Sequence, residues 1–90
     1  MEYSESSLGK ILRNMYDCAP KGYQSTMVHI FGIKYGRVIK QNRFDIKMIV
    51  KYSGISSAYH TEVSKGVKLG DWVQVMPSRA NELNDDIELI

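Results

Sequence analysis

The feature that most constrains the fold of this chain is a tight turn at Gly54, between two short segments whose apolar residues have helical spacing. In the first segment Asp45 is the predicted N-cap, and Gly54 can adopt the positive φ that ends a helix. The residues predicted to line the inner face of this helix are Ile46, Ile49, Val50 and Ser53, with Tyr52 as a further apolar candidate.

The second helix of the pair is predicted over residues 56–66. Ser56 is its N-cap, Ile55 fills the angle between the helices, and Val63 returns to the core before Gly66 ends the helix. The side chains left on its outer face are small, hydroxylated or basic: Ser57, Ala58, Thr61 and Ser64 or Lys65. Such side chains allow a helix to enter the major groove of DNA, which is ~12 Å wide, and to contact base edges.

At residues 54–66 the sequence resembles the phage-repressor/Cro (lambda-repressor-like) family of helix-turn-helix regulators. The family pattern there is Gly-Ile-Ser-x-x-Tyr-(apolar)-Ser-x-(Ile/Val)-x-x-Gly. The residues in register with it are Gly54, Ile55, Ser56, Tyr59, Val63 and Gly66, and upstream Ile46, Ile49 and Val50 also match. The resemblance covers residues 46–66 only. It implies that the second helix binds an operator, with base contacts from Ser57, Ala58 and Thr61 and phosphate contacts from nearby basic groups.

Two residues depart from the family pattern. His60 stands where the family usually has a buried aliphatic residue, and Val50 replaces the usual Ala where the two helices cross closely. The family's last two helices also have no counterpart, because residues 72–76 are predicted as a strand. A helix pair retained only as a scaffold is therefore the alternative to one that binds DNA.

The charges are unevenly distributed, although the formal net charge is only +2. Residues 1–20 carry two basic and three acidic side chains, residues 21–68 nine basic and two acidic, and residues 69–90 one basic and five acidic. The middle of the chain thus has a surplus of seven positive charges. A basic segment followed by an acidic one indicates a charged partner, with nucleic acid as the first candidate. The lysines predicted to neutralise phosphates around the second helix are Lys47, Lys51, Lys65 and Lys68.

Two more helices are predicted before this pair. The first has one apolar face formed by Leu8, Ile11, Leu12, Met15 and Tyr16. Ser6 or Ser7 is its predicted cap, and Pro20 and Gly22 end it.

The second of these helices is predicted over residues 27–41, with Ser25 or Thr26 as its cap. A strand over residues 27–31 is the competing interpretation, and the helix is preferred. Gly32 and Gly36 lie four residues apart on one face of it, so they can admit a neighbouring helix at close range.

After the helices, residues 72–76 alternate weakly and are predicted as a short strand that Pro77 stops. Ile87, Leu89 and Ile90 predict a second short strand or a docking tail. The predicted fold class is mainly α: a compact four-helix domain that contains a helix-turn-helix, with a short C-terminal β element. One domain is expected over residues 1–80, followed by an acidic tail or short strand over residues 81–90.

Single residues have two interpretations. Trp72 is predicted as a core residue or an anchor in a dimer. His29 and His60 are predicted as core residues with hydrogen-bonded rings, while a pH-sensitive or base-contacting role is the alternative for His60.

Catalysis, metals and cofactors are not expected. The two His and the single Cys lack metal-binding spacing, and no phosphate-binding glycine motif follows a predicted strand. Cys18 alone cannot form an internal disulfide.

No apolar run reaches the ~20 residues of a transmembrane helix, and no signal peptide opens the chain, so a cytoplasmic location is expected.

The function predicted from these patterns is that of a small, sequence-specific transcriptional regulator of phage, plasmid or defence type that binds double-stranded DNA. A homodimer is expected because one recognition helix reads too few base pairs. Residues 72–76 and the acidic C-terminus are the candidate dimer surface. The alternative is a protein-interaction module or inhibitor, built on the same scaffold, that does not bind DNA but binds a protein through the acidic C-terminus or the second helix.

Overall fold

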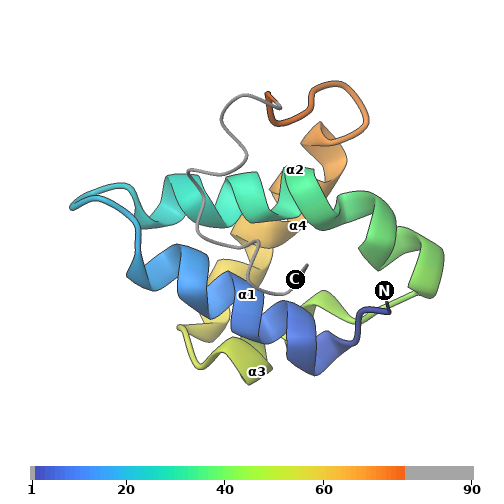
Figure 1. The fold of residues 1–90 in the computed structure, drawn as a ribbon, viewed down its shortest axis with the longest axis horizontal. Helices are drawn as coiled ribbons and strands as arrows, with labels where there is room; N and C mark the ends of the chain where they lie inside the picture. The colour runs from blue at the N-terminus through green and yellow to red at the C-terminus, as the bar shows by residue number, and fades with distance from the viewer. Residues whose placement is uncertain (1, 77–90) are drawn as a thin grey trace.

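A computed structural model describes residues 2–76, and this part of the chain folds into four α-helices (Figure 1). They are α1 (Glu5–Asp17), α2 (Gln24–Asn42), α3 (Ile46–Ser53) and α4 (His60–Leu69), and a single 3₁₀ turn, η1 (Ser57–Tyr59), leads into α4. The predicted mainly helical class is confirmed, as is the helical interpretation of residues 27–41.

The helix α1 forms because its apolar stripe faces the core and its first turn is capped. Leu8, Ile11 and Leu12 are fully buried. The cap is Ser4, two or three residues earlier than the predicted Ser6 or Ser7. Its Oγ accepts a hydrogen bond from the Ser7 amide at 3.0 Å, and its own amide donates to Ser7 Oγ at 2.8 Å. Ser7 therefore has the reciprocal role at the third helical position, because a run of serines offers several candidate caps and only Ser4 has the extended backbone that a cap requires.

Ser4→Ala is expected to lower the free energy of unfolding by about 1 kcal/mol, because it leaves the Ser7 amide without its acceptor. Urea denaturation followed by circular dichroism measures this loss. Ser25→Ala is the matched control: Ser25 is exposed in the first turn of α2, where no side chain makes a cap hydrogen bond. Equal losses in the two variants would contradict the assigned cap.

The helix α2 begins at Gln24, so Ser25 and Thr26 lie inside its first turn and the prediction that they cap it is wrong. The helix ends at Arg43, which adopts a left-handed conformation with φ of 54°. The Phe44 amide then donates to the Ile39 carbonyl, which closes the last turn and directs the chain into α3.

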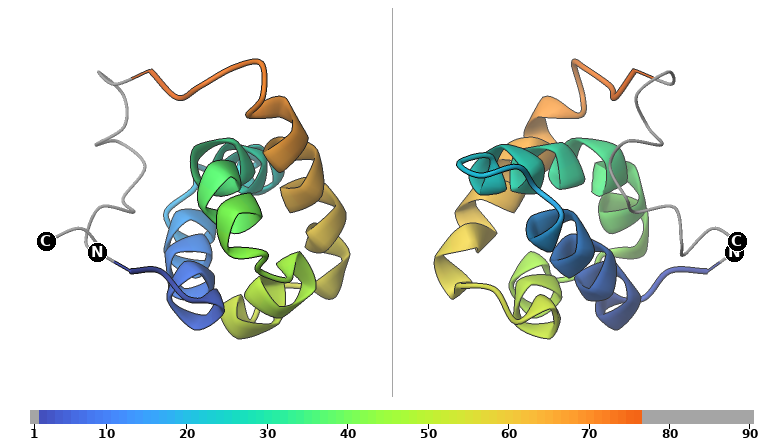
Figure 2. Two further views of the ribbon diagram at one scale, coloured as in Figure 1. Left: turned by 90° about the vertical axis from the view of Figure 1, so that its right-hand side faces the viewer. Right: turned by 60° about the vertical axis from the view of Figure 1, so that its left-hand side comes forward.

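The four helices pack as two pairs. Figure 2 shows α1 beside α3 and α2 crossing α4. Both pairs approach closely at glycine: a Cβ atom on Gly32 would lie 2.5 Å from the Val63 carbonyl oxygen, and one on Gly9 would lie 2.9 Å from the Ile49 carbonyl oxygen. The predicted close approach at Gly32 and Gly36 is confirmed, and its partner is α4. The buried core between the pairs comprises Leu8, Ile11, Leu12, Met15, Val28, Phe31, Tyr35, Ile39, Ile49, Val50, Val63 and Val67.

The predicted strand over residues 72–76 is wrong. The amides of Trp72 and Val73 donate back to the Leu69 carbonyl, at 2.9 and 3.0 Å, so the chain makes a turn there. No strand is present in residues 2–76 with which this segment could pair. Trp72 is 87% exposed, which excludes the predicted core position. The second predicted strand, at Ile87, Leu89 and Ile90, lies outside the described residues, as does the predicted tail over residues 81–90.

Candidate nucleic-acid interface

The turn between α3 and α4 is fixed by local hydrogen bonds. Asp45 caps α3 as predicted: its Oδ1 accepts from the Lys47 amide at 2.9 Å. Gly54 ends α3 with φ of 78°, and its amide donates to the Lys51 carbonyl. Ser53 is buried, and its hydroxyl donates to the Val50 carbonyl and accepts from the Ile55 amide. These contacts hold the angle at which α4 leaves α3.

The second helix of the pair starts as a tighter turn and extends further than predicted. Ser56 Oγ accepts from the Ala58 amide at 3.3 Å, so Ser56 is a cap as predicted, but it caps the 3₁₀ turn η1. The helix α4 then runs to Leu69, beyond the predicted end at Gly66. Gly66 is an interior residue of α4 that faces α2, which explains why glycine occurs there without ending the helix.

Tertiary contacts attach this segment to the other helices. Tyr59 packs edge-on against Tyr16 of α1, with 5.5 Å between the ring centroids. The pKa of Tyr16 is raised above its ordinary value, mainly by a hydrogen bond with the Tyr59 side chain. On the other side, His29 Nε2 of α2 lies 2.6 Å from Glu62 Oε2 of α4. The start of α4 is therefore held from both α1 and α2.

Both histidines differ from their predicted core positions. His29 and His60 are half-buried. His60 Nδ1 lies 3.2 Å from the Ser57 carbonyl oxygen, so its ring is hydrogen-bonded to the turn. His60 stands where the phage-repressor/Cro pattern usually has a buried aliphatic residue. In this chain that position is the first residue of α4, where a half-buried polar ring can be accommodated.

The structure places most of the candidate DNA-binding residues on the surface. The exposed ones are Ser56, Ser57, Ala58, Thr61, Lys65, Lys68, Lys47 and Lys51, and Ser64 is half-buried. A hollow of about 350 Å³ is lined by Lys47, Ser57, Ala58 and His60. It brings the first turn of α3 next to the start of the second helix, whereas Lys65 and Lys68 lie further along α4. Two of the three side chains predicted to contact bases, Ser57 and Ala58, therefore lie together with Lys47, one of the predicted phosphate contacts.

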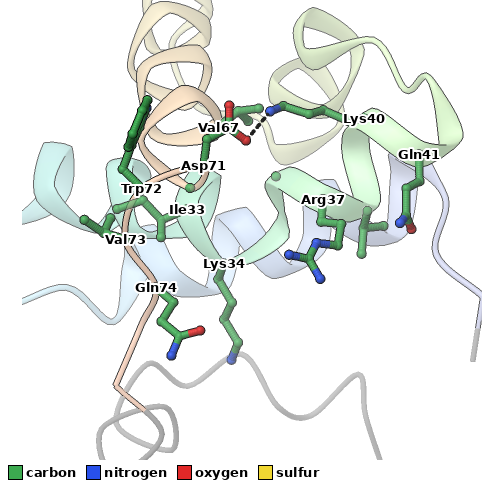
Figure 3. Close-up of a pocket in the computed structure, with 13 residues that line it drawn as sticks. Ile33, Lys34, Arg37, Lys40, Gln41, Val67, Asp71, Trp72, Val73 and Gln74 are labelled. Carbon is green, nitrogen blue, oxygen red and sulfur yellow. Dashed lines mark hydrogen bonds and ion pairs between the residues drawn. The ribbon is translucent and has the colours of Figure 1, made fainter.

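A second surface was not predicted. The exposed side of α2 and the segment after α4 enclose a groove of about 950 Å³, whose lining includes Lys34, Arg37, Trp72, Val73 and Gln74 (Figure 3). Lys40 Nζ, also in its lining, bonds Asp71 Oδ1 at 2.7 Å. The spacing of the basic residues at 34, 37 and 40 was the available sequence signal, since side chains three apart share a helix face. The other side of the groove, formed by residues 72–74, was not predicted because these residues were assigned to a strand.

The described residues contain no cluster of three or more His, Cys, Asp or Glu side chains placed to hold a metal ion. Within the same part of the chain, no helix combines the length and the apolar character needed to cross a bilayer.

Comparison with known proteins supports the helix-turn-helix. No curated protein and no solved structure matches this chain. A family model described as an HTH-like domain matches residues 4–76, which include all four helices and the turn at Gly54. That match does not distinguish the phage-repressor/Cro family, so the narrower resemblance stays a prediction. The chain belongs to the HTH-like domain family.

Proposed function

We propose that this chain is a small, non-catalytic transcription regulator of phage, plasmid or defence type that binds operator DNA as a homodimer. The observation that carries the proposal is the surface formed by η1 and the first turn of α4. There Ser57, Ala58 and Thr61 are exposed beside a turn whose geometry is fixed from both sides.

Two kinds of contact with DNA are proposed. The hydroxyls of Ser57 and Thr61 can donate to or accept from base edges, and Ala58 can pack against a thymine methyl group. Lys47, which shares the hollow with Ser57, is proposed to neutralise a phosphate beside the groove. Side chains at the start of the second helix are the ones that contact base edges in helix-turn-helix proteins.

The remaining proposed phosphate contacts come from Lys51, Lys65 and Lys68. All three are exposed. Lys51 lies in the last turn of α3, three residues before Gly54, and the other two lie on α4. The surplus of positive charge over residues 21–68 extends the same field over the domain and favours a polyanionic partner.

A second candidate function is a protein-interaction module that uses the same scaffold. The observation that favours it is the groove between α2 and residues 70–74, where the exposed Trp72 lies beside basic side chains. Aromatic and arginine side chains are enriched at protein interfaces.

Titration with random duplex DNA at several salt concentrations distinguishes the two functions. We expect binding that weakens linearly in log–log form as salt rises, and Lys65→Ala is expected to reduce the slope by about 1. Lys21→Ala removes an exposed lysine outside the helix pair and is the matched control, with an unchanged slope. Thr61→Ala is expected to weaken binding to a selected operator by about 1–3 kcal/mol while leaving the slope unchanged.

The contrary result is also specific. If the folded chain does not bind duplex DNA even at low salt, DNA binding is excluded and the protein-interaction module is supported.

A further inference from the structure

The groove between α2 and the segment after α4 carries a positive charge that the described part of the chain does not neutralise. Lys34 and Arg37 are three residues apart on α2, so they share a helix face, and both line the groove (Figure 3). Lys40 also lines it but already pairs with Asp71 at 2.7 Å. Arg37 is exposed, and no acidic side chain of residues 2–76 forms an ion pair with it. Its guanidinium is therefore open to a carboxylate from outside that part of the chain.

The opposite side of the groove is apolar. Figure 3 shows Trp72 and Val73 across from Arg37, and these two side chains are 87% and 49% exposed. Cationic groups beside apolar ones are complementary to a segment that carries both carboxylates and apolar side chains. The chemistry of the groove thus fits an acidic peptide with apolar residues.

The acidic side chains of the described residues do not supply this carboxylate. Glu2 does not line the groove. Those between residues 5 and 71 already have partners within the described part of the chain: Glu5 on the Asp45 amide, Asp17 on Arg13, Asp45 on the Lys47 amide, Glu62 on His29, and Asp71 on Lys40. A carboxylate for Arg37 therefore comes from beyond residue 76 or from another molecule.

The end of the chain has the required composition. Four of the ten acidic residues lie there, together with three large apolar ones: Glu82, Asp85, Asp86 and Glu88, and Ile87, Leu89 and Ile90. We propose that residues 82–90 bind in the groove of their own chain, with Asp85 and Asp86 on Arg37 and the apolar side chains against Val73.

The covalent connection to the groove favours this occupant over other anions. Gln74 lines the groove, and Glu82 follows it by eight residues, which span at most about 28 Å. A short tether gives an effective concentration in the millimolar range. Ion pairs that are individually weak at a surface therefore suffice in the same chain, where they would not hold a separate molecule. An acidic partner protein would have to displace the segment.

Amide NMR spectra of the isotopically labelled full chain without DNA test the proposal. Raising the salt concentration from about 0.01 M to about 1 M reduces the screening length from about 30 Å to about 3 Å, so the segment is expected to dissociate. The amides of residues 82–90 and the Arg37 Nε–H group should then shift together, to an extent that does not depend on protein concentration. Asp85→Asn combined with Asp86→Asn is expected to move the Arg37 signal to its high-salt position already at low salt.

The converse variant changes the groove. Arg37→Glu is expected to move the amides of residues 82–90 to their high-salt positions at low salt, and it should keep the circular dichroism spectrum of the parent chain because Arg37 is exposed. Lys21→Glu makes the same charge change in the turn before α2 and is the matched control, with unchanged segment amides. Combining Arg37→Glu with Asp85→Arg and Asp86→Arg reverses both sides of the contact and should restore the salt-dependent shift.

Three results would overturn the proposal. Amides of residues 82–90 that respond neither to salt nor to Arg37→Glu mean that the segment does not bind in the groove. Shifts that grow with protein concentration mean that the segment of a second copy occupies it. If added duplex DNA moves the Arg37 signal and the segment variants do not, a phosphate is the ligand of Arg37. The proposal does not depend on DNA binding, so it can fail while the proposed function stands.

Discussion

Gly66→Ala is expected to lower the free energy of unfolding by about 3 kcal/mol, a large part of the ~5–13 kcal/mol available to a domain of this size. A Cβ atom on Gly66 would overlap the His29 carbonyl oxygen and approach the Gly32 Cα atom to 3.0 Å. Both obstacles are backbone atoms of α2 and no rotamer change can remove them, so the two helices must separate. The intrinsic helix preference of Ala over Gly, about 1 kcal/mol, offsets only part of this cost.

Gly36→Ala on the same crossing is the matched control. A Cβ atom there would lie 3.2 Å from the Val67 Cα atom, so a small shift accommodates it. The expected change is below about 1 kcal/mol, because the helix preference of Ala acts in the opposite direction. Urea denaturation followed by circular dichroism gives both values. Gly66→Ala as stable as the parent chain would show that α2 and α4 do not cross at these glycines.

This crossing shows how far the sequence predicts the fold. The spacing of Gly32 and Gly36 predicts a close neighbour, because glycine in a helix interior needs a packing reason. The identity of that neighbour depends on tertiary structure, and Gly66, its partner, has the sequence signature of a helix end. Local propensity cannot separate a glycine that ends a helix from one that permits a crossing, so α4 was predicted three residues too short.

The candidate site was predictable where local chemistry determines it. The Asp45 cap, the left-handed Gly54 and the Ser56 cap follow from side-chain hydrogen bonds within a few residues. The contact of Tyr16 with Tyr59 joins residues more than 40 positions apart, and no periodicity reveals such a pair. The strand prediction for residues 72–76 failed for another reason. The apolar residues of this segment fit both a strand and a helix period, and the sequence does not show that residues 2–76 contain no strand for it to pair with.

Replacing four lysines with alanine at once is the other change with a large expected effect, and it rests on the proposed function. The set is Lys47, Lys51, Lys65 and Lys68, all exposed. Each phosphate contact contributes about 0.9 to the slope of log affinity against log salt. The slope is therefore expected to fall by up to about 4, and affinity for duplex DNA at about 50 mM salt by at least about 100-fold. Fluorescence anisotropy with labelled duplex DNA measures both quantities, and the unfolding midpoint should stay near that of the parent chain.

The control for this variant removes the same charge from elsewhere on the surface. Its set is Lys10, Lys21, Arg37 and Lys40, which are exposed and lie outside the α3–α4 pair. Loss of these charges lowers only the long-range field, which salt screens within about 10 Å at 0.1 M. Affinity should therefore fall far less than in the first variant, and the slope should remain close to that of the parent chain. If both variants lose affinity and slope equally, the net charge of the domain binds DNA, and the face formed by α3 and α4 has no special role in it.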